Sequence, residues 1–236
     1  MLNWARQNHD NQLLLSLKTV TWFFLFLLAA KFYSVISVML FLFFSFLLYA
    51  RPLHKAHEYP TIFAFILMLV ISVAAMALFS GGGSFLVALI FSLIFYLLLG
   101  IKEHLIVNRG KIYYMTILGI LYVCYLFFFA SDKSNWFLLK YLAIIVAIFL
   151  LFREWLVLAT NFNFPKRQLL VACAVALIIG QMLWATALLP IGILSASNIL
   201  MLFTFISGDF IFKHFIGGIS RKFIIQQSII FLTFAA

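Results

Sequence analysis

The sequence has very few charged residues. Asp, Glu, Lys and Arg make up 9% of its 236 residues, whereas hydrophobic residues make up 67%. An ordinary soluble domain carries about 25% charged residues, so this chain has too little polar surface to cover a water-soluble fold. The composition therefore excludes a soluble globular domain and predicts a multi-pass membrane protein.

Cysteine and catalytic sequence motifs are scarce as well. The two cysteines, Cys124 and Cys173, both lie inside apolar runs, so neither a disulfide framework nor a thiolate metal site is indicated. We find no Gly-rich phosphate loop, no Gly-x-Ser-x-Gly nucleophile elbow and no pair of carboxylates within a membrane segment. These absences argue against an ATPase, a serine hydrolase of that type and an intramembrane aspartyl protease. No cofactor is predicted.

Long apolar runs fill most of the chain. A membrane-spanning helix needs about 20 residues, and the first apolar region, Leu13 to Ala50, fits two spans better than one, although neither glycine nor proline marks the turn at Lys31. The segments between runs are short. We therefore expect an all-α bundle of eight or nine transmembrane helices in a single membrane domain, residues 1–236, with no soluble domain. The predicted spans are 13–30, 33–50, 61–79, 85–101, 113–130, 136–152, 169–189, 195–212 and 223–236.

The basic residues are distributed unevenly about these spans. If the amino terminus is cytosolic, the outer turns hold only Lys31, Lys133 and Lys140, which leaves 13 of the 16 Lys and Arg residues on the inner side. This bias is the one that the positive-inside rule predicts. We expect a cytosolic amino terminus in a prokaryotic cytoplasmic membrane, with the basic loops contacting anionic lipid headgroups and not nucleic acid.

Polar residues enter the apolar sequence mainly between residues 181 and 209. Gln181, Asn198, Thr204 and Asp209 are the candidates for an intramembrane polar path. An unpaired amide inside a membrane costs several kcal/mol, so Gln181 needs a partner, either across a helix interface or on a solute. Asp209 either forms an ion pair with Lys213, four residues further on, or belongs to the path.

Two further features surround these residues. Ala172, Ala176 and Gly180 recur every four residues and predict a face for close helix packing. The segment Leu189 to Asn198 is either an outer loop in which Ser195 or Ser197 caps the next helix, or an interrupted helix whose amino terminus faces an anion.

A weak metal candidate lies on the predicted cytosolic side. His54, His57, Glu58 and His104 are of the residue types that bind zinc, manganese or iron. They match no known metal signature, and headgroup contact and solvation of the loops explain them better, so no metal is predicted.

Three classes of function are compatible with the sequence. The first is a membrane-embedded subunit or assembly factor that packs against other membrane subunits or against copies of itself. The second is a carrier or flippase-like transporter of a small or lipidic solute along the polar path. The third is a lipid-directed enzyme that uses the cytosolic His and acid residues. The last apolar run reaches Ala236 after 14 residues, so either the natural terminus lies further on or this helix is buried among the others.

Overall fold

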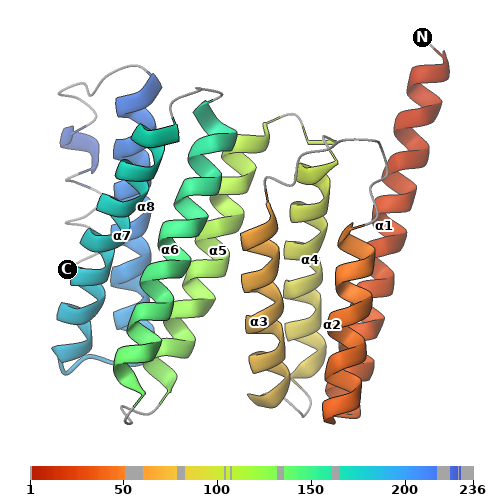
Figure 1. Cartoon of the computed structure of the whole chain (residues 1–236), viewed down its shortest axis with the longest axis horizontal. Helices are drawn as coiled ribbons and strands as arrows, with labels where there is room; N and C mark the ends of the chain where they lie inside the picture. The colour runs from red at the N-terminus through yellow and green to blue at the C-terminus, as the bar shows by residue number, and fades with distance from the viewer. Residues whose placement is uncertain are drawn as a thin grey trace. The chain divides into compact units, whose positions relative to one another are not determined.

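The computed structural model (Figure 1) describes residues 2–50, 61–78, 83–103, 105–106, 108–131, 136–160, 165–216, 224–227 and 229. All regular secondary structure in these residues is α-helix. The helices are α1 (Leu2–Lys31), α2 (Val35–Ala50), α3 (Ile62–Leu78), α4 (Ser84–Lys102), α5 (Arg109–Ala130), α6 (Phe137–Thr160), α7 (Pro165–Leu188) and α8 (Ile193–Ile216). Residues 224–227 and 229 are also helical.

Six of these helices, α1 and α4 to α8, are long and apolar enough to cross a membrane. This agrees with the predicted all-α, multi-pass architecture. The other two, α2 and α3, are also apolar but have only 16 and 17 described residues, which is about 25 Å of helix. The final predicted span, 223–236, lies largely outside the described residues.

The first apolar region forms two helices, as predicted, and serine makes the turn between them. The Ser34 hydroxyl accepts a hydrogen bond from the Ser37 backbone N–H at 3.2 Å, and the Ser37 hydroxyl accepts one from the Ser34 N–H at 3.0 Å. This reciprocal pair has the geometry of a capping box, which satisfies two of the free N–H groups at the start of α2. A helix can therefore begin here without glycine or proline.

Several helices extend beyond their predicted ends. α6 continues for eight residues past residue 152, so Arg153 and Glu154 are helical and not part of a loop. α1 begins at Leu2 and includes the polar residues before Leu13. The predicted spans differ from these helix ends because hydropathy marks the depth of the hydrocarbon layer, whereas a helix ends only where its backbone groups find other partners.

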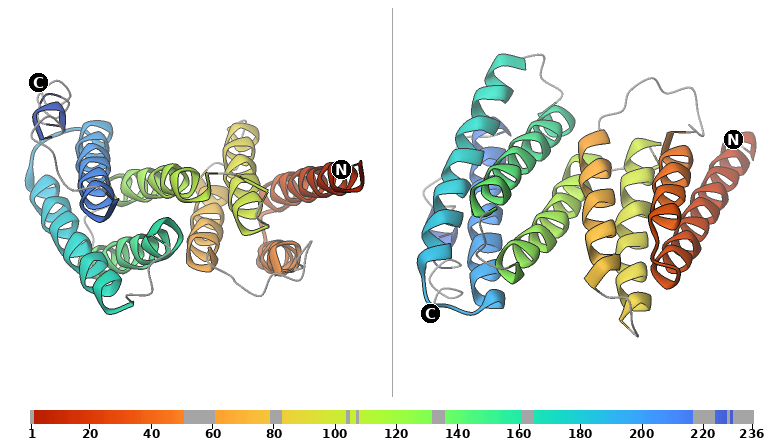
Figure 2. Two further views of the ribbon diagram at one scale, coloured as in Figure 1. Left: turned by 90° about the horizontal axis from the view of Figure 1, so that it is seen from above. Right: turned by 60° about the horizontal axis from the view of Figure 1, so that its bottom comes forward.

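The chain divides within α5 into two compact units, residues 1–116 and 117–236. Unit 1 contains α1 to α4, which the left view of Figure 2 shows from above. Its core is aromatic: Trp22 of α1 stacks on Phe95 of α4 with ring centroids 5.3 Å apart. One turn further along α1, Phe26 stacks on Phe91, one turn earlier in α4. α1 and α4 therefore run antiparallel with rings in register.

Unit 2 is packed through small residues. Ala172, Ala176 and Gly180 are all buried in it, and a Cβ atom added at Gly180 would lie 2.9 Å from the Ile145 side chain of α6. The absence of a side chain at Gly180 thus lets α7 approach α6 closely. The predicted packing face of α7 is confirmed.

Candidate functional site

Two interhelical hydrogen bonds connect α5 and α8 inside unit 2. The Tyr122 hydroxyl donates to Asn198 Oδ1 at 2.9 Å, and the hydroxyls of Tyr125 and Thr204 lie 2.9 Å apart. Tyr125 and Thr204 are fully buried. Thr204 also donates to the Leu200 carbonyl at 2.7 Å, so its hydroxyl is the acceptor for Tyr125. The two tyrosines were not among the predicted candidates, because tyrosine is common in membrane helices and carries no positional signal by itself.

Asp209 has a hydrogen-bond partner that the sequence did not indicate. Its Oδ2 accepts a hydrogen bond from Gln227 Nε2 at 2.9 Å. Lys213 acts on Asp209 electrostatically, but the hydrogen-bonding partner comes from the last helical segment and not from α8. Gln227 is 4% exposed, and its Oε1 receives no hydrogen bond from the described residues. A carboxylate and an amide therefore connect the end of α8 to the segment that follows it.

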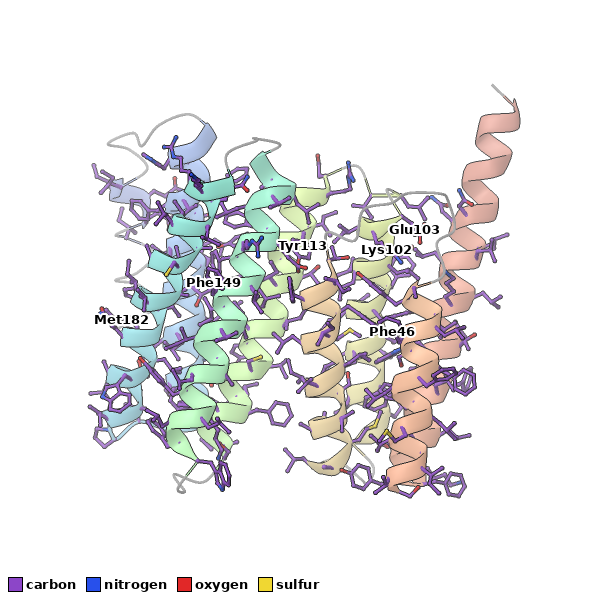
Figure 3. All side chains as sticks on the ribbon, in the orientation of Figure 1. Phe46, Lys102, Glu103, Tyr113, Phe149 and Met182 are labelled. Carbon is purple, nitrogen blue, oxygen red and sulfur yellow. The ribbon has the colours of Figure 1, made fainter. Side chains whose placement is uncertain are left out.

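Gln181 lies apart from these groups. It is exposed, and it makes no hydrogen bond with any residue that the structure describes. Its neighbour Met182 is labelled in Figure 3 on the outer side of α7, away from α6. Gln181 lies seven residues before the end of the Lys166–Leu188 span, which places it about 10 Å inside the span along the helix axis. Gln181 therefore shares no hydrogen bond with Asn198, Thr204 or Asp209, which have partners of their own.

The segment between α7 and α8 is an exposed turn. Leu189 to Ser195 are all exposed, and α8 begins at Ile193. Ser195 and Ser197 therefore lie inside the helix, and neither caps it. Ser197 instead donates to the Ile193 carbonyl at 2.9 Å, while the Gly192 carbonyl accepts the first N–H, from Ala196, at 2.9 Å. The predicted serine cap was wrong because Gly192 occupies the capping position, where glycine is tolerated almost as well.

A buried lysine is the main polar group in unit 1. The predicted span 85–101 stops one residue before Lys102, but Lys102 is the last residue of α4 and is 3% exposed. Its Nζ donates to the Tyr49 carbonyl and lies 4.4 Å from the centre of the Tyr49 ring. Lys102 and Glu103, at the end of α4, are labelled in Figure 3. Lys102 thus satisfies one of the last four carbonyls of α2, which have no partner within their own helix.

Tyr49 extends this cluster to α3. Its ring stacks on Phe65 with centroids 3.9 Å apart, and its hydroxyl hydrogen-bonds to Thr61 at the start of α3. Glu103 and Lys18 both act electrostatically on the Lys102 ammonium. The ends of α2, α3 and α4 are therefore connected by four residues, Lys102, Tyr49, Thr61 and Phe65. We call these four residues the end cluster of unit 1.

The structure does not test the predicted metal candidate. His54, His57, Glu58 and His104 all lie outside the described residues. Among the residues that are described, no group of three or more His, Cys, Asp or Glu side chains has the spacing to hold a metal ion. The two cysteines lie apart: Cys124 is buried and Cys173 is exposed, and both are free thiols.

Comparisons with known proteins yield no relative. No protein family, no curated protein and no solved structure matches the sequence. The function of this chain must therefore be inferred from its apolar helices and its polar geometry. Within the described residues, the apolar helices suit a multi-pass membrane protein, and its polar residues include interhelical hydrogen bonds in unit 2 and an exposed amide, Gln181.

Proposed function

We propose that the protein is a membrane-embedded subunit or assembly factor, which acts by packing against other membrane helices. The observation that carries this proposal is Gln181. Its amide is exposed within a membrane span, and it has no partner among the described residues. An amide left in hydrocarbon costs several kcal/mol, whereas a hydrogen bond to another helix contributes about 0.6 to 2 kcal/mol. A helix from outside the chain would supply that bond.

The other polar candidates support the same interpretation. Asn198, Thr204 and Asp209 each have a hydrogen-bond partner within unit 2. A solute path requires polar groups that are free to exchange partners with the solute, but these three already connect helices to one another. Their arrangement therefore favours a scaffold over a solute path.

Gentle extraction and native mass spectrometry test this proposal. The wild-type chain should be released together with a partner polypeptide or a further copy of itself. Gln181→Leu should weaken that association by about 5-fold to 30-fold, the equivalent of 1 to 2 kcal/mol. Met182→Leu, at the adjacent exposed position, is the matched control and should leave the association intact. A wild-type protein that is monomeric under conditions where membrane complexes survive, and is unaffected by Gln181→Leu, contradicts the proposal.

A carrier is the second candidate, and one observation favours it. Gln227 is buried next to the Asp209 carboxylate with an amide oxygen that has no partner in the described part of the chain. A carboxylate can take up a proton, and carboxylate and amide oxygens together can bind a hard cation. In proteoliposomes loaded with a pH-sensitive dye, a carrier of this type should show a flux that Asp209→Asn abolishes. Equal flux in both proteins, or none in either, removes this candidate.

We also propose the orientation that the basic residues indicate. With the amino terminus cytosolic, the lysine and arginine residues collect on the inner face, where anionic headgroups attract them. The setting that fits this pattern is a prokaryotic cytoplasmic membrane. The test is a reporter protein that is active only in the cytosol, fused before Met1. We expect this reporter to be active. A fusion that is stable but inactive would show that the amino terminus lies on the other side of the membrane.

A further inference from the structure

Two side chains in the interior of unit 1 carry polar atoms without a hydrogen bond. Trp22 of α1 and Ser45 of α2 are both fully buried. Neither the Trp22 Nε1–H nor the Ser45 hydroxyl has a hydrogen-bond partner in the part of the chain that the structure describes. Burying a polar group without a hydrogen bond is unfavourable, so such groups in folded proteins are nearly always satisfied by the protein or by ordered water.

The Ser45 hydroxyl differs from other buried hydroxyls in these helices. A serine or threonine within a helix can donate to the backbone carbonyl four residues earlier. Ser72 and Thr116 do so here, at 2.7 and 2.8 Å, but Ser45 does not. Its hydroxyl is therefore available to a group that lies outside its own helix.

The register of α1 and α2 places Trp22 and Ser45 at the same level. The two helices follow each other through the short turn at Ser34 and run antiparallel, side by side (Figure 1). The rings of Phe26 and Phe41 meet across them with centroids 5.9 Å apart. One turn back in α1 and one turn forward in α2 lead from this pair to Trp22 and Ser45. The Trp22 ring also lies 5.4 Å from that of Phe41.

The next turn along both helices agrees with this register. It pairs Lys18 with Tyr49, and both of these residues act on the Lys102 side chain. Lys18 does so electrostatically, and Tyr49 does so through its backbone carbonyl. Trp22 and Ser45 therefore lie one turn inward from the end cluster of unit 1.

The chemistry of this level specifies a small, neutral ligand. A donor and a hydroxyl that lie at one level without a direct bond are suited to a bridging molecule. Full burial limits its size, and the neighbouring rings of Phe41 and Phe95 offer nothing to balance a charge. Water meets both conditions. It can accept from the indole N–H and donate to the serine oxygen, which gives it the two polar partners that a buried water needs.

We infer that unit 1 binds a single water molecule between Trp22 and Ser45, and that this water joins α1 to α2. The Trp22 N–H donates to the water, and the water donates to the Ser45 hydroxyl oxygen. The inference does not depend on the proposed subunit role, because that role is based on Gln181 in unit 2. It adds a hydrogen-bonded bridge to the aromatic core of unit 1.

An experimental density map of the full chain in lipid, at a resolution that shows ordered water, tests this inference. A peak should lie within about 3.2 Å of both Trp22 Nε1 and Ser45 Oγ. The peak should be lost in Ser45→Ala, which removes one of its two partners. It should be retained in Ser72→Ala, the matched control, because Ser72 is equally buried but has its own partner. A direct bond between Trp22 and Ser45, or no peak between them, overturns the inference.

The Trp22 indole provides a second measurement by nuclear magnetic resonance. Its N–H signal is identified by its loss in Trp22→Phe. Ser45→Ala should move this signal upfield, because the hydrogen bond to water is lost, whereas Ser72→Ala should leave it in place. Alanine is the best helix former, so both variants should fold, and an unchanged signal from Trp155 in unit 2 checks this. No shift in Ser45→Ala, or equal shifts in both variants, overturns the role of Ser45.

Discussion

In unit 1 the helices are held by aromatic rings stacked across their interfaces, and the polar contacts gather at one end. Trp22 and Phe26 meet Phe95 and Phe91 along α1 and α4, while Lys102 and its partners lie where α2, α3 and α4 terminate or begin. Unit 2 also has rings across its interfaces, such as Trp155 of α6 stacked on Phe212 of α8, but there α7 lies against α6 at Gly180, and the polar bonds are spread along α8.

The difference shows two ways of joining apolar helices in a medium as apolar as they are. Lipid removes the hydrophobic driving force between helices, so packing and hydrogen bonds must hold them together. Large rings provide extensive dispersion contact without a close backbone approach. Small residues let backbones approach, and hydroxyl and amide groups then add directional bonds. Substitutions that remove a ring contact or a close helix contact from one unit should therefore leave the stability of the other unit unchanged.

The largest effect is expected at Trp22, the largest buried side chain of unit 1. Trp22→Ala should lower the free energy of unfolding by about 3 to 5 kcal/mol, because it leaves a cavity against Phe95 and Phe41. Denaturation in detergent measures the loss, and hydrogen exchange locates it in α1 and α4. Phe46→Ala, at a residue of α2 that is 54% exposed, is the control and should cost much less. An equal loss of unfolding free energy at both positions would show that the stacked rings do not stabilise unit 1.

Lys102 tests the end cluster. Lys102→Met should destabilise unit 1 by about 1 to 3 kcal/mol, since it leaves the Tyr49 carbonyl at the end of α2 without its donor. Lys102→Arg preserves the charge and the donors and should recover part of the loss. Hydrogen exchange at the last turn of α2 is the appropriate measurement. Unchanged protection of that turn in Lys102→Met would mean that water or lipid replaces the lysine.

Gly180 tests close packing in unit 2. Gly180→Val should cost about 1 to 3 kcal/mol, because its Cβ would lie 2.9 Å from the Ile145 side chain and the two helices would have to separate. Gly119→Ala is the matched control, since nothing lies within 4 Å of its added Cβ; alanine also favours a helix by about 1 kcal/mol over glycine. If Gly180→Val left the free energy of unfolding unchanged, α6 and α7 would be loosely packed.

The smallest effect is expected at the hydrogen bond between Tyr125 and Thr204. A double-mutant cycle with Tyr125→Phe and Thr204→Val should give a coupling energy of about 0.6 to 2 kcal/mol, the range for interhelical bonds in membranes. Denaturation of the wild type, both single variants and the double variant provides the four free energies of unfolding that the cycle needs. A coupling energy near zero would remove this bond from the forces that hold α8 in place.

The sequence predicted the positions of most helices but not their ends. Runs of apolar residues identify helices in a membrane because every backbone group there must be bonded within the segment. The helix break after Lys31 was predicted from length alone, whereas its cause is the reciprocal pair Ser34 and Ser37. Such a pair is too common in sequences to be recognised as a cap before the structure is known.

For the candidate site, too, the sequence identified the residues but not their partners. Gln181, Asn198, Thr204 and Asp209 stand out in the sequence because polar groups are rare in membrane helices, and that contrast needs no structure. Which of them has a partner depends on which face of each helix turns inward, and on residues far away in the chain. Gln181 was expected to lie near a partner, but it faces outward from unit 2.

Composition and periodicity by themselves determined the class of this protein, its helical architecture and the small-residue face of α7, because these follow from the chemistry of single residues and their spacing. Tertiary structure alone decided that Lys102 is buried against Tyr49, that Asp209 bonds to Gln227 and that Gln181 lies on the outside. Each of these depends on the rotation of one helix relative to another, which is fixed by packing over the whole interface and not by any local pattern.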